Sequence, residues 1–230
     1  MEQKVYVILI ILVTIGTFLM MSRLYARFQY PFLVPVLTST ILIVVLLLVF
    51  DISYESYMTG GQWIDSFLGP AVVALAYPMY KQRQVIVSYM LPIITGVLAG
   101  LCTALGSGLF LARFLGIDRT IILSMVPKSL TAPVAIPVSS GIGGIPSMTV
   151  VFTMVAGFTG IILGPILLKS LRIRTSLGRG LAFGSASHAL GTSKALEYGE
   201  ETASMSSVSM SLSAILGSVL GPLFVWMFYM

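Results

Sequence analysis

The sequence predicts an all-α polytopic membrane protein with about six to eight membrane elements. Of its 230 residues, 57% are hydrophobic and only 9% are charged, whereas soluble domains carry about 25% charged residues. Apolar residues also gather in runs close to the ~20 residues that a helix needs to cross a bilayer. Further apolar stretches are interrupted by Gly and Pro. This composition excludes a secreted enzyme, a nucleic-acid-binding protein and a disordered tail.

Five strongly apolar runs are predicted to form membrane helices: residues 5–22, 32–50, 86–112, 147–168 and 207–229. The first run is interpreted as a retained span and not as a signal peptide, because Arg23 and Arg27 follow it and no small-residue cleavage site does. An acidic connection with Asp51, Glu55 and Asp65 comes after the second run. It carries no basic residue, which places it outside the cell.

Three apolar stretches are broken by Gly, Pro, Ser or Thr, namely 63–80, 117–146 and 176–206. Breaks at membrane depth are tolerated only where the backbone is buried in protein or lines a polar cavity. The cations between 168 and 180 mark a cytoplasmic loop. We therefore expect 117–146 to be re-entrant from outside and 176–206 to be re-entrant from inside.

Short similarities about 57 residues apart, such as Gly96–Gly100 with Thr153–Gly157, suggest an inverted repeat. Chance similarity between apolar segments is the alternative. The whole chain is then a single integral membrane domain with four parts: N-terminal helices in 1–85, repeat halves in 86–146 and 147–206, and a C-terminal helix in 207–230.

The first candidate half of a binding site lies in 117–146, where prolines and glycines cluster around hydroxyl side chains and Lys128. Proline removes a backbone donor and ends or kinks a helix. Hydroxyls there can bind the freed backbone or a solute. The predicted site residues are Ser129, Thr131, Gly143 and Gly144. In the alternative interpretation the segment is a kinked helix whose hydroxyls bind its own carbonyl groups.

The second candidate half contains the only histidine of the chain, and its predicted residues are Ser187, His188, Thr192 and Lys194. A half-helix N-terminus favours an anion. His188 is the candidate proton carrier, because an imidazole exchanges a proton near neutral pH. A purely structural hydrogen bond of His188, or a buried pair between Lys194 and a glutamate, is the alternative.

Enzymatic chemistry is not expected. His188 neighbours Ser187, but no acidic residue or nucleophile motif completes a catalytic triad. One histidine and one cysteine do not make a zinc site, so no metal or other cofactor is predicted. The glycines at 141–144 do not form a dinucleotide-binding motif, which requires a preceding strand.

The broken segments resemble the CidB/LrgB family of bacterial membrane proteins. The resemblance rests on Ser129–Pro133, Ile142–Ser147 and Gly184–Glu197, together with Phe67–Ala71 and Tyr80–Gln82, and extends from about residue 30 to the C-terminus. Members were first described as holin- or antiholin-like modulators of murein hydrolase activity and autolysis. They act beside a small CidA/LrgA-like membrane protein. Related proteins, including a plastid member, are associated with transport of pyruvate, glycolate or glycerate.

The resemblance implies a multi-pass protein of the bacterial plasma membrane. Together with the two broken segments and His188, it predicts that the protein moves a small monocarboxylate, coupled to a proton. Its expected partners are the bilayer and a CidA/LrgA-like protein in a homo- or hetero-oligomer, with no nucleic acid. The alternative is a holin- or antiholin-like regulator that acts by protein–protein interaction. One departure is Gly141, where an amide or acid is expected before the Gly-Gly pair. This departure puts the substrate preference in question.

Overall fold

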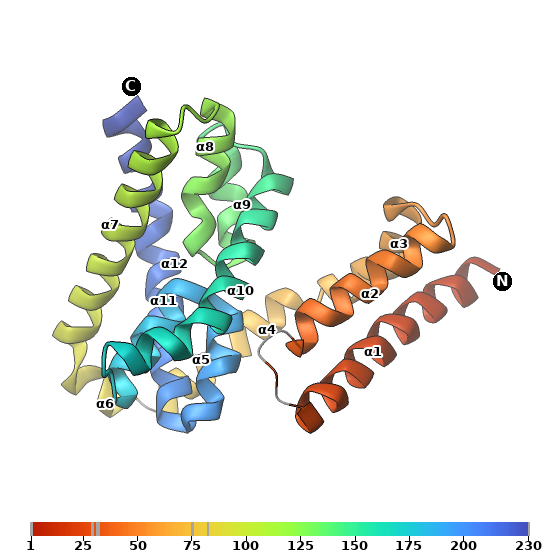
Figure 1. Cartoon of the computed structure of the whole chain (residues 1–230), viewed down its shortest axis with the longest axis horizontal. Helices are drawn as coiled ribbons and strands as arrows, with labels where there is room; N and C mark the ends of the chain where they lie inside the picture. The colour runs from red at the N-terminus through yellow and green to blue at the C-terminus, as the bar shows by residue number, and fades with distance from the viewer. Residues whose placement is uncertain (1, 29, 31–32, 75, 82, 230) are drawn as a thin grey trace. The chain divides into compact units, whose positions relative to one another are not determined.

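The computed structural model describes residues 2–28, 30, 33–74, 76–81 and 83–229. Every regular element in these ranges is helical, in agreement with the predicted class. The chain divides into two compact units, residues 1–74 and residues 75–230 (Figure 1). The second unit holds both broken segments that carry the predicted site residues.

The first unit consists of α1 (Glu2–Phe28), α2 (Pro35–Val49), α3 (Tyr54–Asp65) and α4 (Leu68–Ala74). α1 packs along α2 and α3, and the Thr14 hydroxyl lies 3.1 Å from the Tyr57 hydroxyl. α3 forms where the sequence predicts only an acidic connection. It begins there because the Ser53 hydroxyl accepts a hydrogen bond from the Ser56 N–H and thus caps the helix.

The second unit is built around three long helices. These are α7 (Met90–Phe114), α10 (Pro146–Ser170) and α12 (Glu200–Tyr229). The short helices α5 (Ala76–Lys81) and α6 (Arg83–Ser88) precede them. Within the described residues, the 63–80 stretch is interrupted at Ser66 and Phe67, between α3 and α4. α7 and α12 run in the same direction, because Ile93 packs against Met205 at one end and Arg113 donates to the Phe228 carbonyl at the other.

Four helices in the described residues are long and apolar enough to cross a membrane: Lys4–Phe28 within α1, and α7, α10 and α12. α2 is apolar but has only 15 residues. The described residues of the predicted apolar runs are mostly helical, although the 86–112 run is divided between α6 and α7. The count of six to eight membrane elements stays a prediction. The last predicted boundary was wrong, because α12 begins at Glu200 and not at 207. Carboxylates in a first helical turn are favoured by the helix dipole.

The 117–146 segment folds back on itself. It forms α8 (Arg119–Met125), the 3-10 helix η2 (Val126–Ser129) and α9 (Ala132–Gly141). Leu130 is extended, with φ −103° and ψ 161°. A Cβ atom at Gly221 of α12 would meet both Val126 and Val138. The two legs are therefore antiparallel, and they join at a tip near Leu130.

The 176–206 segment folds back in the same way. α11 (Ser176–Ala195) consists of two helical legs that meet at a kink at His188, where the backbone is non-helical, with φ 44° and ψ −128°. The 3-10 helix η3 (Leu196–Tyr198) follows it. The Phe183 and Tyr198 rings lie 5.6 Å apart, which brings the second leg back beside the first. The tip of this hairpin is His188.

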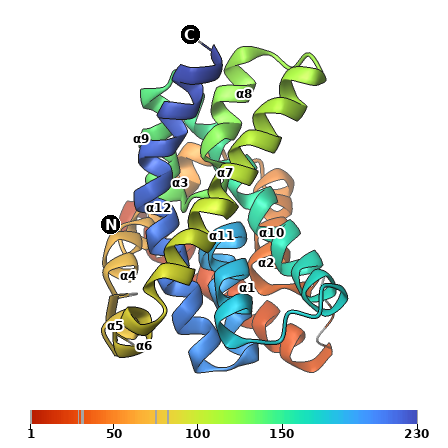
Figure 2. The same ribbon diagram turned by 90° about the vertical axis from the view of Figure 1, so that its left-hand side faces the viewer.

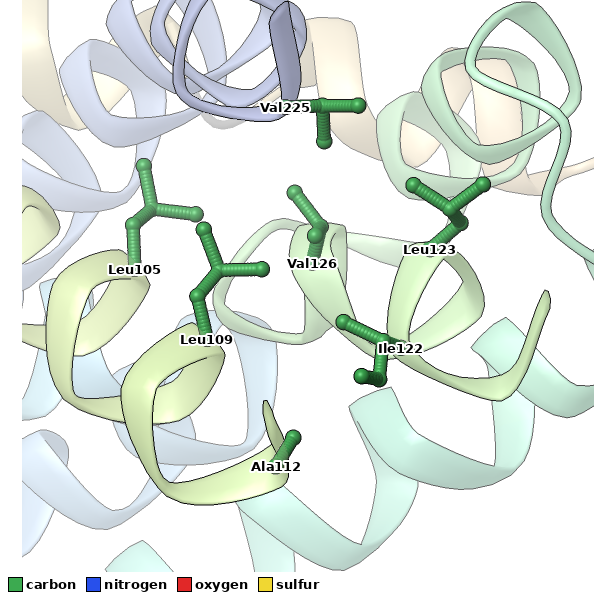
Figure 3. Close-up of a cluster of buried hydrophobic side chains, with 7 residues drawn as sticks. All are labelled: Leu105, Leu109, Ala112, Ile122, Leu123, Val126 and Val225. Carbon is green, nitrogen blue, oxygen red and sulfur yellow. The ribbon is translucent and has the colours of Figure 1, made fainter. Parts of the chain in front are cut away.

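The two hairpins enter the unit from opposite ends (Figure 2). The first hairpin follows α7 at the end of the unit where the C-terminus of the chain lies. The second hairpin follows α10 at the other end of the unit. Apolar contacts hold the first hairpin between α7 and α12: Figure 3 shows Leu105, Leu109, Ala112, Ile122, Leu123, Val126 and Val225 pointing toward one another. The second hairpin packs against α7, α10 and α12.

Candidate functional site

The two helix breaks contact each other inside the second unit. His188 Nε2, at the tip of the second hairpin, lies 3.0 Å from the backbone carbonyl oxygen of Lys128 in the first. A carbonyl oxygen only accepts, so Nε2 carries the hydrogen and donates it. The carbonyl is free to accept because the chain leaves the helix at the extended residue Leu130, so that none of the described N–H groups of the following turn bonds to it. One break thus supplies the hydrogen-bond donor and the other supplies the acceptor.

This junction lies about half way along two of the membrane-spanning helices. The Lys128 ammonium lies 3.4 Å from the Ala104 carbonyl oxygen in the middle of α7. On the other side, a Cβ at Gly157, in the middle of α10, would lie 3.4 Å from His188 Cε1. That distance is an ordinary van der Waals contact, so the imidazole lies directly beside α10. The breaks therefore meet near mid-span, where irregular backbone is tolerated only inside protein.

Lys128 brings a positive charge to this junction. Its side chain is half-buried, and within the described part of the chain no carboxylate lies within ion-pairing distance of its ammonium group. The predicted site set does not include Lys128. The signal was present in the sequence, since Lys128 stands between Pro127 and Ser129 in a broken apolar stretch. An unpaired cation at membrane depth indicates a functional site.

All four hydroxyl residues of the predicted site lie near the two tips. Ser129 is buried in η2, and Thr131 is the N-cap residue of α9 without a side-chain capping bond. Thr192 Oγ1 donates to the His188 carbonyl at 3.1 Å and lies 3.0 Å from Ser206 Oγ on α12. Ser187 Oγ is buried and has no hydrogen-bond partner among the described residues. A buried hydroxyl without a partner is unfavourable in the absence of a ligand.

Three predicted site residues lie elsewhere in the same unit. Gly143 and Gly144 form the turn that joins α9 to α10, at the end of α9 opposite Thr131 and so about 15 Å away along the helix. Gly143 adopts φ 86° there, which favours glycine. Lys194, six residues beyond His188, pairs with Glu197 at 2.6 Å. Glu197 is exposed, so this ion pair differs from the buried pair that the alternative interpretation of Lys194 describes.

Small residues explain why the second hairpin fits between its neighbours. A Cβ at Gly160 of α10 would collide with Ser187 Oγ, and one at Gly184 would collide with the Ser206 carbonyl oxygen of α12. α12 in turn buries an unbroken stretch, residues 202–210, with four serines and a threonine. Small side chains let helices in membranes approach closely. The tip of α11 is therefore held tightly against both spans.

The described residues contain no cluster of three His, Cys, Asp or Glu side chains that could hold a metal ion. The groups at the junction are an imidazole, an ammonium group, hydroxyls and the N-terminus of α9. Chemically this set can bind a small anion and exchange a proton.

Comparison with known proteins gives the family. The sequence model of the LrgB-like family matches residues 14–227. The chain is 62% identical over 229 residues to the uncharacterized protein YxaC of Bacillus subtilis (strain 168), with all of both chains covered. It is 40% identical over 229 residues to the holin-like protein CidB of Staphylococcus aureus (strain Mu50 / ATCC 700699), again with complete coverage. No solved structure matches. The resemblance seen in the broken segments is thus confirmed, and the chain belongs to the LrgB-like family of bacterial membrane proteins.

Proposed function

We propose that this protein carries a small monocarboxylate, such as pyruvate or glycolate, across the bacterial plasma membrane together with a proton. The observation that carries the proposal is the contact between the two helix breaks, His188 Nε2 to the Lys128 carbonyl oxygen at 3.0 Å. Substrate sites of secondary transporters form where discontinuous helices meet near mid-span. The resemblance to carboxylate-transporting relatives agrees with this reading.

The charge at the junction favours an anion. Lys128 is half-buried without a carboxylate partner in the described residues, and the ten-residue helix α9 directs its N-terminus toward the same tip. The positive end of a helix and a lysine both attract a carboxylate. A bound monocarboxylate would supply the missing countercharge, and the hydroxyls of Ser129, Thr131, Ser187 and Thr192 would orient it.

His188 is the proposed proton carrier. Nε2 is occupied by its bond to the Lys128 carbonyl oxygen, which is the one hydrogen bond of the ring within the described residues, and Nδ1 makes none there. Nδ1 is thus the ring atom that can take up or release a proton. A proton on His188 would add a second positive charge beside the anion, so substrate and proton would favour each other's binding.

An inverted repeat would explain how the site is exposed alternately to the two sides. α7 and the first hairpin are followed, at a nearly constant interval, by α10 and the second hairpin: the spans begin at Met90 and Pro146, and the hairpins at Arg119 and Ser176. The hairpins enter from opposite ends. In transporters such halves move against each other around a fixed site.

The test is uptake of labelled pyruvate and glycolate into proteoliposomes, with and without an inward proton gradient. Saturable uptake that the gradient accelerates is the expected result, and His188→Ala is expected to abolish it. Ser193→Ala is the matched control, because Ser193 lies in the same hairpin but is exposed. No uptake by the natural protein, even with a CidA/LrgA-like protein co-reconstituted, would contradict the proposal.

A regulatory role remains the second candidate, because the relative at 40% identity is named a holin-like protein. In that case the chain would act through a CidA/LrgA-like partner in an oligomer and not by carrying solute. His188→Ala, which is expected to abolish uptake, would then leave partner binding and lysis unchanged. Pull-down with the partner and a lysis assay therefore separate the two candidates.

A further inference from the structure

A cavity of about 380 Å³ lies at the end of α10, away from the junction of the two breaks. Four cations line it: Lys169 at the end of α10, Arg172 and Arg174 in the following turn, and Arg179 in the first leg of the second hairpin. Tyr198, at the end of the second leg, forms another wall. The volume falls within the range of about 300–1,000 Å³ that is typical of small-ligand sites.

No acidic side chain lines this cavity. The nearest carboxylate in sequence, Glu197, pairs with Lys194 at 2.6 Å. Four positive charges around one hollow repel one another unless an anion lies between them. The cavity is therefore electrostatically matched to a ligand with a concentrated negative charge.

One of the cations is fixed in place before any ligand arrives. Arg179 Nε donates to the Ile173 carbonyl oxygen at 3.2 Å, and the guanidinium carbon lies 5.0 Å from the centre of the Tyr198 ring. The remaining guanidinium N–H groups stay available for a ligand. A planar guanidinium matches a phosphate group, to which it donates two parallel hydrogen bonds.

Exposed apolar side chains lie in the same last turns of α10 as the cavity residues Leu168 and Lys169, on the other faces of the helix. Ile166, Leu167 and Leu171 are exposed there, in a helix that is long and apolar enough to cross the membrane. A free phosphate would use only the cations. A phospholipid would use both features, with its headgroup in the cavity and its chains against these residues.

We propose that this cavity binds the phosphate-bearing headgroup of an anionic phospholipid. Basic pockets at the ends of membrane helices are suited to such headgroups. Because Arg179 and Tyr198 belong to opposite legs of the second hairpin, a bound headgroup would hold the base of that hairpin closed. The site is independent of the proposed carboxylate site and does not require transport to be correct.

The test measures binding of phosphatidylglycerol and phosphatidylcholine to the detergent-purified full chain by native mass spectrometry. The natural protein is expected to prefer phosphatidylglycerol. In the double variant Lys169→Gln/Arg174→Gln, phosphatidylglycerol binding is expected to weaken roughly 25-fold, about fivefold for each charge removed. This pair leaves the positive φ of Arg172 (55°) and the stacked Arg179 untouched.

The matched control is Arg113→Gln/Arg119→Gln, which removes two exposed cations at the opposite end of the unit. It is expected to change binding by less than twofold. Equal weakening in both double variants would mean attraction to the general surface charge and would overturn the proposal. Inorganic phosphate is expected to compete only weakly. If it bound as tightly as phosphatidylglycerol, the ligand would be free phosphate and the assignment to a lipid would be wrong.

Discussion

The imidazole of His188 donates a hydrogen bond from Nε2 to the backbone carbonyl oxygen of Lys128, at 3.0 Å and across 60 residues of sequence. The bond joins the tips of two hairpins that enter the second unit from opposite ends. A movement of either hairpin tip must therefore stretch or break it. This dependence makes the two residues the natural place to test both substrate binding and proton coupling.

Replacing His188 with Gln is expected to separate proton coupling from binding. Glutamine keeps an N–H group that can donate to the Lys128 carbonyl, but it cannot take up a proton near neutral pH. We expect uptake of labelled pyruvate to fall to the rate seen without a proton gradient and to lose its dependence on pH. Proteoliposome uptake at several external pH values measures this. Gradient-dependent uptake that persists in His188→Gln would assign proton transfer to another group.

Replacing Lys128 with Gln is expected to weaken carboxylate binding strongly. A hydrogen bond to a charged group contributes about 1.5–3 kcal/mol, so KM for uptake should rise by roughly 10- to 150-fold. Lys194→Gln removes the same charge from a residue already paired with Glu197 at 2.6 Å and is the matched comparison. We expect it to change KM by less than threefold. Equal effects of the two substitutions would contradict the special role of Lys128.

Replacing Ser187 with Ala is expected to affect substrate and stability in opposite directions. Its buried Oγ has no partner among the described residues, so its removal should leave the melting temperature unchanged or raise it. If the hydroxyl binds the carboxylate, KM should rise about fivefold, equivalent to ~1 kcal/mol. Thermal unfolding and uptake on the same preparation give both values. A lower melting temperature with unchanged KM would show a purely structural role.

The positions of the two helix breaks follow from local chemistry, and so they were predictable. Prolines remove donors on both sides of Lys128, and glycines and hydroxyl residues dominate the stretch around His188. Both predicted segments, 117–146 and 176–206, contain the observed breaks. The second prediction extended too far, since the helix after it begins at Glu200. Acidic residues in a sequence suggest a loop between helices, but they are also favoured in the first turn of a helix, as at the start of α12.

The contact between the breaks was not predictable, because it depends on how α7, α10 and α12 pack around the hairpins. Sequence reasoning placed Lys194 and His188 in one group because they are close in the chain. Packing instead brings Lys128 to His188 and leaves Lys194 with Glu197. Gly143 and Gly144 were assigned to the site for the same reason of proximity, yet they form the turn before α10. Nearness in sequence does not show which end of a hairpin leg a residue occupies.

Replacing Gly184 with Ala is expected to destabilise the second hairpin. A Cβ there would collide with the Ser206 carbonyl oxygen and lie 2.9 Å from Ser209 Cβ, both on α12. Overpacking of this kind costs about 1–3 kcal/mol, so the melting temperature in detergent should fall. Gly106→Ala is the control, because a Cβ at Gly106 in α7 meets nothing within 4 Å. That substitution should leave the melting temperature unchanged or raise it, since Ala favours helix over Gly by about 1 kcal/mol. If both variants melted at the temperature of the natural protein, the close packing of α11 against α12 would be disproved.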